Sequence, residues 1–266
     1  MSDPRPIGVF DSGVGGLTVL RELQQQLPAE STIYFADLGH FPYGPRFQGQ
    51  VRQFSLRIIR FLEELDVKLV VIACNTATAA ALNAARETFD IPIVGVITPG
   101  AQAAVQATRN RKIAVISTEG TMQSGEYLHA IKEANPTIGV MPRAAPGLVE
   151  LVERGQAQAP EAEAALRQAL AEIIEFAPDT LILGCTHYPL LKGVLHWVTK
   201  GDLELISSAE AVARDVYARL VSEGLLRRVA ELGRRRFIVS GDPGQFRAVG
   251  SRFLPELWEV EAVPWY

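Results

Sequence analysis

The sequence of 266 residues contains no apolar run long enough to cross a bilayer. Its first residues, Met1–Pro6, lack the basic flank and the apolar core of a signal peptide. A formal charge of −4 gives the chain no general affinity for nucleic acid or for anionic membranes. These absences predict a cytoplasmic protein that binds neither nucleic acid nor membrane.

Cysteine is scarce, because Cys74 and Cys185 are the two cysteines of the chain. In a reducing cytoplasm a structural disulfide between them is not expected. The pair could be two reactive thiols, a redox couple that forms a reversible disulfide, or two small buried apolar side chains. The sequence has no C-x-x-C or H-x-x-x-H spacing that would support a metal site. We therefore predict that the protein holds no metal.

Hydrophobic residues make up 48% of the chain and charged residues 21%, which is typical of a globular protein. Short apolar runs of β type alternate with amphipathic segments, and this alternation predicts an α/β protein with mainly parallel sheets. The clearest predicted helices are Leu17–Leu27, Gln48–Leu65 and Ala162–Phe176. The predicted strands are Ile7–Phe10, Thr32–Ala36, Lys68–Ala73, Pro92–Val96, Lys112–Ile116, Thr137–Met141, Thr180–Leu183, Glu204–Ile206, Arg236–Val239 and Trp258–Val263.

A weak internal repeat relates the two cysteines. The strand Ile7–Phe10 precedes an apolar run that ends at Cys74, and Ile113–Ile116 precedes one that ends at Cys185. We therefore expect two pseudo-symmetric α/β domains, with the active site in the cleft between them. Their predicted extents are residues 1–98 plus 208–266 for the first domain and 99–207 for the second.

Both cysteines follow predicted parallel strands, and ligands of open α/β sheets bind outside the carboxyl ends of the strands. A thiol at the start of a following helix also meets the positive end of the helix dipole, which favours the thiolate. His187 lies two residues beyond Cys185. A histidine in such a place is often only a packed side chain, but beside a thiol it can act as a base or an orienting group.

Two further loops follow predicted strands. Asp11–Thr18 is rich in glycine, so it is either a tight turn or a site where backbone N–H groups meet an anion. It lacks the spacing of a nucleotide-binding loop. Asp37–Pro45 reads as an ordinary loop, although backbone N–H groups of Tyr43 and Gly44 could bind a carboxylate.

Four motifs together resemble the bacterial glutamate racemases. They are IGVFDSGVGGLTV at Ile7–Val19, Pro42-Tyr43-Gly44, ACNTAT at Ala73–Thr78 and LGCTHYP at Leu183–Pro189. The resemblance implies interconversion of L- and D-glutamate without a cofactor, supply of D-glutamate for peptidoglycan, and a homodimer. Where relatives often have Ala-Cys-Pro, this chain has Ala144-Ala145-Pro146, and the missing cysteine is not one of the two implied bases.

The resemblance also implies the roles of site residues. The two catalytic bases would be Cys74 and Cys185, with Asp11 orienting the first and His187 and Glu153 orienting the second. The substrate would contact Asp11, Ser12, Pro42, Tyr43, Gly44, Asn75, Thr76, Thr118, Thr186 and His187.

The chemistry explains why two thiols are needed. Inverting an α-carbon removes a proton from one face and returns one to the other, so two bases on opposite sides are the direct solution. An ordinary thiol has a pKa of about 8.5, so both of its protonation states are accessible near neutral pH. The alternatives are a racemase of another acidic amino acid, an amino-acid-binding module without catalysis, and a thiol redox protein.

Overall fold

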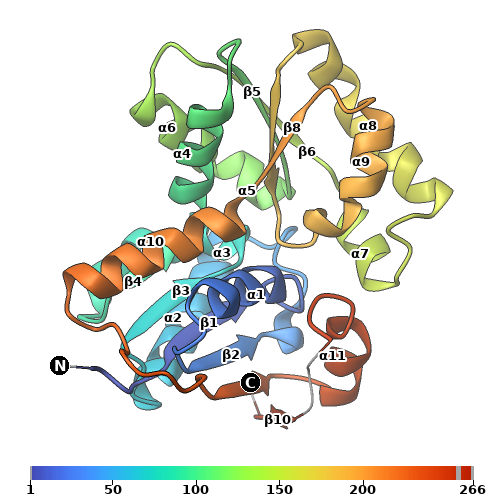
Figure 1. The fold of residues 1–266 in the computed structure, drawn as a ribbon. Helices are drawn as coiled ribbons and strands as arrows, with labels where there is room; N and C mark the ends of the chain where they lie inside the picture. Colours follow the sequence, from blue (N-terminus) through green and yellow to red (C-terminus); the bar gives the residue numbers. More distant parts are fainter. Residues whose placement is uncertain (1, 256–258, 265–266) are drawn as a thin grey trace. The chain divides into compact units, whose positions relative to one another are not determined.

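The structure is a computed structural model that describes residues 2–255 and 259–264. Contacts between residues group the chain into two compact units. Unit 1 comprises residues 1–96 and 209–266, and unit 2 comprises residues 97–208. Both units alternate strands and helices along the chain (Figure 1).

Unit 1 contains a six-stranded parallel sheet with the order β10-β9-β2-β1-β3-β4. The central strands are buried along their whole length and mostly apolar, as expected for strands covered on both faces. The elements of unit 1 are β1 (Ile7–Asp11), α1 (Leu17–Gln26), β2 (Thr32–Ala36), the 3₁₀ helix η1 (Leu38–His40), α2 (Gln48–Glu64), β3 (Leu69–Ile72), α3 (Asn75–Thr88), β4 (Ile93–Gly95), α10 (Ser208–Ser222), β9 (Arg235–Val239), α11 (Pro243–Gly250) and β10 (Val260–Ala262).

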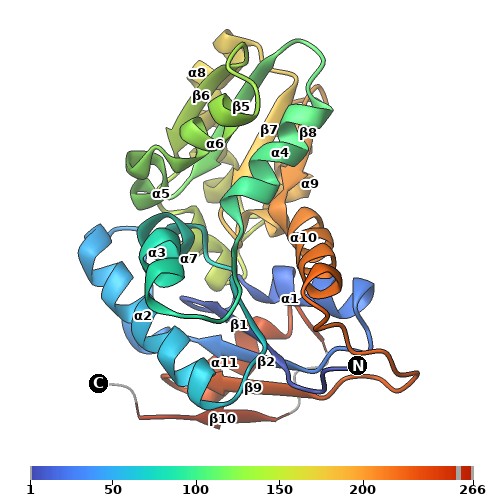
Figure 2. The ribbon, with the colours of Figure 1, turned by 90° about the vertical axis from the view of Figure 1, so that its left-hand side faces the viewer.

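Helices cover both faces of this sheet (Figure 2). On one face, Phe10, Phe35 and Ile72 pack into one apolar cluster with side chains of α2 and α3. On the other, Tyr34 stacks on Phe246 of α11, with ring centroids 6.0 Å apart. The return of the chain from residue 209 therefore completes both the sheet and its covering layer.

Unit 2 contains a four-stranded parallel sheet with the order β6-β5-β7-β8. The helices α4 and α6 lie on one face of this sheet, and α8 and α9 lie on the other (Figure 1). The elements of unit 2 are α4 (Ile97–Ala107), β5 (Lys112–Ser117), α5 (Glu119–Ser124), α6 (Glu126–Ala134), β6 (Gly139–Ala144), α7 (Leu148–Glu153), α8 (Pro160–Phe176), β7 (Thr180–Gly184), the 3₁₀ helix η2 (Tyr188–Leu191), α9 (Lys192–Val198) and β8 (Glu204–Ser207).

The predicted α/β class and the internal repeat are confirmed, because β2-β1-β3-β4 of unit 1 and β6-β5-β7-β8 of unit 2 follow the same strand order. Each predicted strand has a counterpart, although one is displaced and the last is shorter than predicted. The strand expected at Thr137–Met141 lies at Gly139–Ala144, and the last expected strand is Val260–Ala262. Trp258, which was included in that last prediction, lies outside the described residues.

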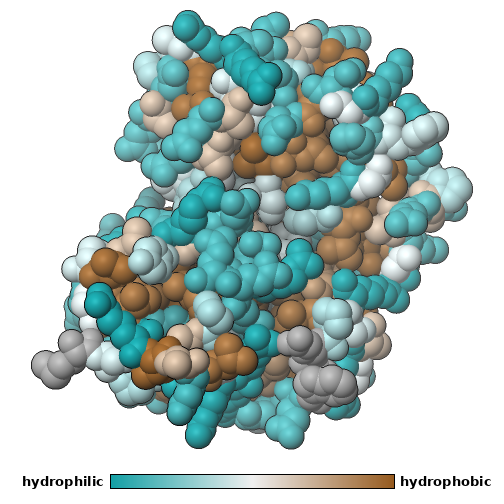
Figure 3. Space-filling model, in the orientation of Figure 1, coloured by the Kyte–Doolittle hydropathy of each residue, from teal (hydrophilic) through white to brown (hydrophobic). Residues whose placement is uncertain are grey.

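Hydrophilic side chains occupy much of the surface in Figure 3, and apolar side chains appear there as separate patches. Among the described helices, none is both long and apolar enough to cross a membrane. The most exposed large apolar side chains are Phe47, Leu232 and Trp197. They come from distant parts of the sequence, and scattered exposed apolar residues are ordinary for a folded domain.

Candidate active site

Unit 1 brings Asp11 and Cys74 to one point of its sheet. From β1 the chain passes to β2 on one side and later to β3 on the other, so the strand order switches between β1 and β3. Asp11 is the last residue of β1, and Cys74 follows β3 by two positions. Both side chains are buried. Because open parallel sheets bind ligands at such switch points, this edge of unit 1 is a candidate site.

Cys74 is the N-cap of α3. Its backbone is extended, with φ −70° and ψ 127°, and its sulfur accepts a hydrogen bond of 3.5 Å from the backbone N–H of Ala77. Ser12 Oγ lies 3.9 Å from the same sulfur. Asn75 and Thr76 form the first turn of α3 beside it. The sulfur thus lies at the positive end of a helix dipole, which stabilises negative charge on it.

The glycine-rich turn after β1 is fixed by packing. Asp11 Oδ1 accepts a hydrogen bond of 2.9 Å from the N–H of Gly13, whose carbonyl accepts one of 2.8 Å from Tyr34 Oη. A Cβ atom on Gly16 would lie 2.5 Å from Asp11 Cβ and 2.7 Å from Tyr34 Oη. The backbone of Gly16 is right-handed helical, with φ −61° and ψ −13°, so close packing against Asp11 and Tyr34 accounts for the glycine at this position.

The loop that contains Pro42, Tyr43 and Gly44 is anchored from inside. The buried Tyr43 hydroxyl donates a hydrogen bond of 2.5 Å to Asp37 Oδ2. Burial and the Asp37 charge raise the pKa of Tyr43 well above its usual value, so the phenol stays protonated. The Phe41–Pro42 peptide bond is cis. The Tyr43 hydroxyl therefore holds the loop in place through Asp37. The backbone N–H groups of the loop are then the candidates for contact with a ligand.

Unit 2 repeats the arrangement around Thr118 and Cys185. Its strand order switches between β5 and β7, which end immediately before these two residues. Thr118 is the N-cap of α5, and its Oγ1 accepts a hydrogen bond of 3.3 Å from Thr121 N–H. Cys185 is buried, as is the adjacent Thr186. One difference from unit 1 is that the 3₁₀ helix η2, rather than an α-helix, begins after this cysteine.

His187 joins Cys185 to a carboxylate on α7. Its Nδ1 lies 3.8 Å from Cys185 Sγ, and its Nε2 lies 2.6 Å from Glu153 Oε1. Burial of the imidazole opposes its charge, but the hydrogen bonds to Cys185 and Glu153 outweigh burial and raise the pKa of His187 to about 10. The imidazole is therefore charged at neutral pH, beside the sulfur. A thiol, an imidazolium and a carboxylate in line can hold and move a proton.

Several buried groups of these sites were not predicted from the sequence. Asp37 holds Tyr43, and Tyr188 Oη donates hydrogen bonds of 3.0 Å to Ala145 O and 3.3 Å to Ser117 O. Tyr127 is also buried, and burial together with nearby Cys185 raises its pKa. Their positions in the sequence could have indicated these residues, because Asp37 directly follows a strand and Tyr188 belongs to the LGCTHYP motif.

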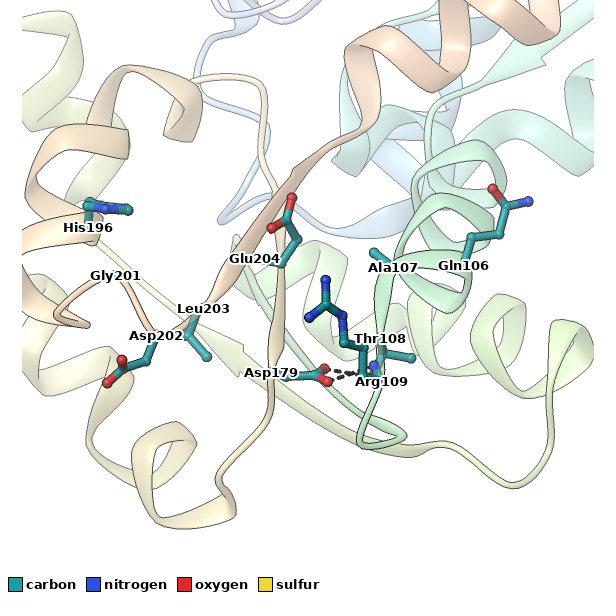
Figure 4. Close-up of a pocket in the computed structure, with 10 residues that line it drawn as sticks. All are labelled: Gln106, Ala107, Thr108, Arg109, Asp179, His196, Gly201, Asp202, Leu203 and Glu204. Atoms are coloured by element: carbon teal, nitrogen blue, oxygen red, sulfur yellow. Dashed lines mark hydrogen bonds between the residues drawn. The ribbon is translucent and has the colours of Figure 1, made fainter.

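A pocket of about 690 Å³ lies at the amino ends of strands β5, β7 and β8 (Figure 4), whereas Thr118 and Cys185 follow the carboxyl ends of β5 and β7. Asp179 belongs to its lining and accepts hydrogen bonds from Thr108 Oγ1 and from the backbone N–H groups of Arg109 and Asn110. This carboxylate thus serves the turn between α4 and β5. The lining residues are Gln106, Ala107, Thr108, Arg109, Asp179, His196, Gly201, Asp202, Leu203 and Glu204.

Cys74 and Cys185 are both free thiols. Among the residues that the structure describes, no three histidine, cysteine, aspartate or glutamate side chains are grouped so that they could hold a metal ion.

The two sheets and their strand-end thiols define an α/β protein suited to acid–base chemistry by cysteine. Residues 7–216 match the family model described as Asp/Glu/Hydantoin racemase, and the chain belongs to this family. The family predicted from the four sequence motifs is therefore confirmed.

The chain is similar over nearly its whole length to proteins named glutamate racemase. One from Geobacter metallireducens is 47% identical over 250 residues, covering 94% of this chain and 93% of the relative. The solved structure of a glutamate racemase isoform from Bacillus anthracis is 40% identical, with a TM-score of 0.93 and 97% of both chains covered. That of the Francisella tularensis glutamate racemase in complex with D-glutamate is 34% identical, with a TM-score of 0.92 and 98% of both chains covered.

Proposed function

We propose that this chain is a glutamate racemase that interconverts L- and D-glutamate by direct proton transfer at the α-carbon. The observation that carries the proposal is that each unit holds one free thiol at the switch point of its own sheet. The near full-length similarity to glutamate racemases, including one solved with D-glutamate, supports glutamate as the substrate. The D-glutamate formed would supply peptidoglycan synthesis.

In the proposed reaction, Cys74 takes the α-proton of D-glutamate and Cys185 takes that of L-glutamate. In each direction one sulfur is a thiolate and the other a thiol that returns a proton. For Cys185, the charged His187 held by Glu153 orients and stabilises the thiolate. For Cys74, the helix start and Ser12 supply the corresponding polar contacts.

The α-proton of an amino acid is only weakly acidic, so charge that develops on the α-carboxylate needs stabilisation. Directed donors in a water-poor site provide such stabilisation. Asn75, Thr76, Thr118 and Thr186 are the candidate donors near the two thiols. The backbone N–H groups of Tyr43 and Gly44 are candidates for a carboxylate as well.

Incubation of the purified protein with L-glutamate in D₂O tests the proposal. We expect D-glutamate to appear together with deuterium at Cα. Circular dichroism measures the change of chirality, and mass spectrometry measures the incorporated deuterium. Binding of glutamate without exchange would indicate a binding module, and faster exchange of aspartate in a substrate panel would indicate another racemase. Either result would overturn the proposal.

Cys→Ser variants test the assignment of the two thiols. If Cys74 serves D-glutamate, the Cys74→Ser variant should lose exchange of D-glutamate more than exchange of L-glutamate, and Cys185→Ser should show the reverse. The opposite losses of exchange would show that Cys74 acts on L-glutamate and Cys185 on D-glutamate.

The proposal includes a homodimer in the cytoplasm, where both thiols remain reduced. Light scattering of the purified protein measures the mass, for which one chain contributes 29.0 kDa. A monomer under assay conditions would remove the homodimer from the proposal and leave the proposed reaction unchanged.

A further inference from the structure

Asp37 is a fully buried carboxylate that follows β2 directly. Its backbone N–H donates a hydrogen bond of 3.0 Å to the carbonyl of Asp11 at the end of β1. Its side chain accepts hydrogen bonds from three groups, namely Tyr43 Oη at 2.5 Å, Ser240 Oγ at 2.6 Å and His40 Nδ1 at 3.0 Å. One carboxylate therefore organises the segment that contains the candidate carboxylate-binding loop.

Ser240 brings the C-terminal part of the chain into this network. It directly follows β9, and its backbone N–H donates a hydrogen bond of 3.0 Å to Ala36 O. Its nearly buried hydroxyl donates to Asp37 and accepts a hydrogen bond of 3.0 Å from the N–H of Gly39. The single hydroxyl thus contacts the start of the loop through both the carboxylate and the backbone.

Close packing leaves this contact little freedom. A Cβ atom on Gly39 would lie 2.6 Å from the carbonyl oxygen of Ser240, so the two backbones meet more closely than another residue at position 39 allows. At the other end of the loop, Arg46 Nε donates a hydrogen bond of 2.7 Å to His40 O, and the His40 ring stacks on Phe54 with centroids 4.0 Å apart. A shift of Ser240 would therefore move the loop.

We propose that Ser240 is a positioning residue, which together with Asp37 sets the loop from Leu38 to Gly44 so that its backbone N–H groups bind a carboxylate of the amino-acid substrate. This inference rests on the proposed function, because it concerns the same binding loop. The contact acts in the free enzyme and in every bound state, so its loss weakens substrate binding more than it slows proton transfer.

Steady-state racemisation by Ser240→Ala tests the proposal. We expect KM for glutamate to rise roughly tenfold, as for the loss of one hydrogen bond to a charged group, with kcat within about twofold of the wild type. Gly39→Ala, which pushes the loop away from β9, should show the same separation of KM from kcat. The Gly39→Ala variant tests the same proposal if Ser240→Ala does not fold.

Ser55→Ala is the matched control. Ser55 is a buried serine of the same unit, but its hydroxyl donates to Val51 O within α2. We expect this variant to keep the KM and kcat of the wild type. A wild-type KM in both Ser240→Ala and Gly39→Ala, or an equal rise of KM in Ser55→Ala, would overturn the proposal.

Amide hydrogen exchange separates failure of this inference from failure of the proposed function. Protection of the Gly39 and His40 amides, which donate to Ser240 Oγ and to Asp37 O, should fall in Ser240→Ala and remain unchanged in Ser55→Ala, whether or not glutamate is turned over. If the wild type does not racemise glutamate, the proposed function fails and the positioning role in binding fails with it. Altered protection then confirms only that Ser240 holds the loop.

Discussion

His187 Nε2 lies 2.6 Å from Glu153 Oε1, and this contact, together with the one to Cys185, keeps the imidazole charged in a buried site. The same ring reaches Cys185 through its other nitrogen. A buried cation between a carboxylate and a sulfur is stable only while both neighbours favour its charge. The contact between His187 and Glu153 therefore sets the electrostatics around Cys185.

Replacing Glu153 by Gln should lower the pKa of His187 below about 10, because burial still opposes the charge and only Cys185 is then left to favour it. The ¹⁵N chemical shifts of the imidazole, followed across pH, measure this directly. We expect the ring of the variant to lose its proton at a lower pH than the ring of the wild type. The same titration midpoint in both proteins would show that Glu153 does not favour the charge.

The stability of the protein should depend on pH through the same group. The folded pKa of His187 lies above the unfolded value of about 6.5, so folding binds a proton between these values. Its stabilising contribution is complete below pH 6.5 and is lost as pH rises toward 10. Urea unfolding of the wild type should show this decline, and His187→Gln should show a smaller one. Equal slopes in the two proteins would contradict the assignment.

In the proposed reaction each thiol is the general acid–base group on one face of the substrate, so alanine at Cys74 or Cys185 should reduce racemisation by about a thousandfold or more. Both side chains are small and buried, so we expect far-UV circular dichroism and cooperative unfolding to remain. Turnover near the wild-type rate in either variant would rule out the two-base reaction.

Gly16→Ala should destabilise unit 1 by about 1–3 kcal/mol, because the new Cβ meets Asp11 Cβ and Tyr34 Oη at less than van der Waals distance. Gly49→Ala is the matched control, since a Cβ there has no atom within 4 Å and Gly49 lies in α2. The control should be neutral or stabilise by up to about 1 kcal/mol. Denaturant unfolding compares them, and equal stability of both variants would refute the packing argument.

Lys68 and Glu30 form a fully buried ion pair, with Lys68 Nζ 2.6 Å from Glu30 Oε2. Lys68→Met should destabilise the protein by about 3–5 kcal/mol, because it leaves a buried carboxylate without its cation. Arg214→Ala removes the exposed pair with Glu210 and should cost less than about 1 kcal/mol. A similar loss of unfolding free energy in both variants would show that burial does not make the Lys68–Glu30 pair more important for stability than an exposed pair.

The sequence was sufficient for the strands and for the positions of both thiols, because buried parallel strands appear as continuous apolar runs. It was less accurate for β6, which is a half-buried edge strand containing Pro142 and Arg143 and so lacks such a run. The pairing of Glu153 with His187 was expected only from the family resemblance. The contact between Asp37 and Ser240 joins residues 203 positions apart, and no local sequence pattern predicts a contact between residues so far apart.

The placement of β9 beside β2 has a consequence for synthesis of the protein. During translation, β1 to β4 emerge first, but β2 keeps an open hydrogen-bonding edge until Arg235–Val239 leave the ribosome. Ser240 emerges directly after them, so the Asp37 carboxylate gains its last partner only after the whole of β9 has left the ribosome. A polypeptide terminated before residue 235 would expose the unpaired edge of β2, which could pair with other chains. If Ser240 acts as proposed, the loop from Leu38 to Gly44 would also lack the contact that positions it.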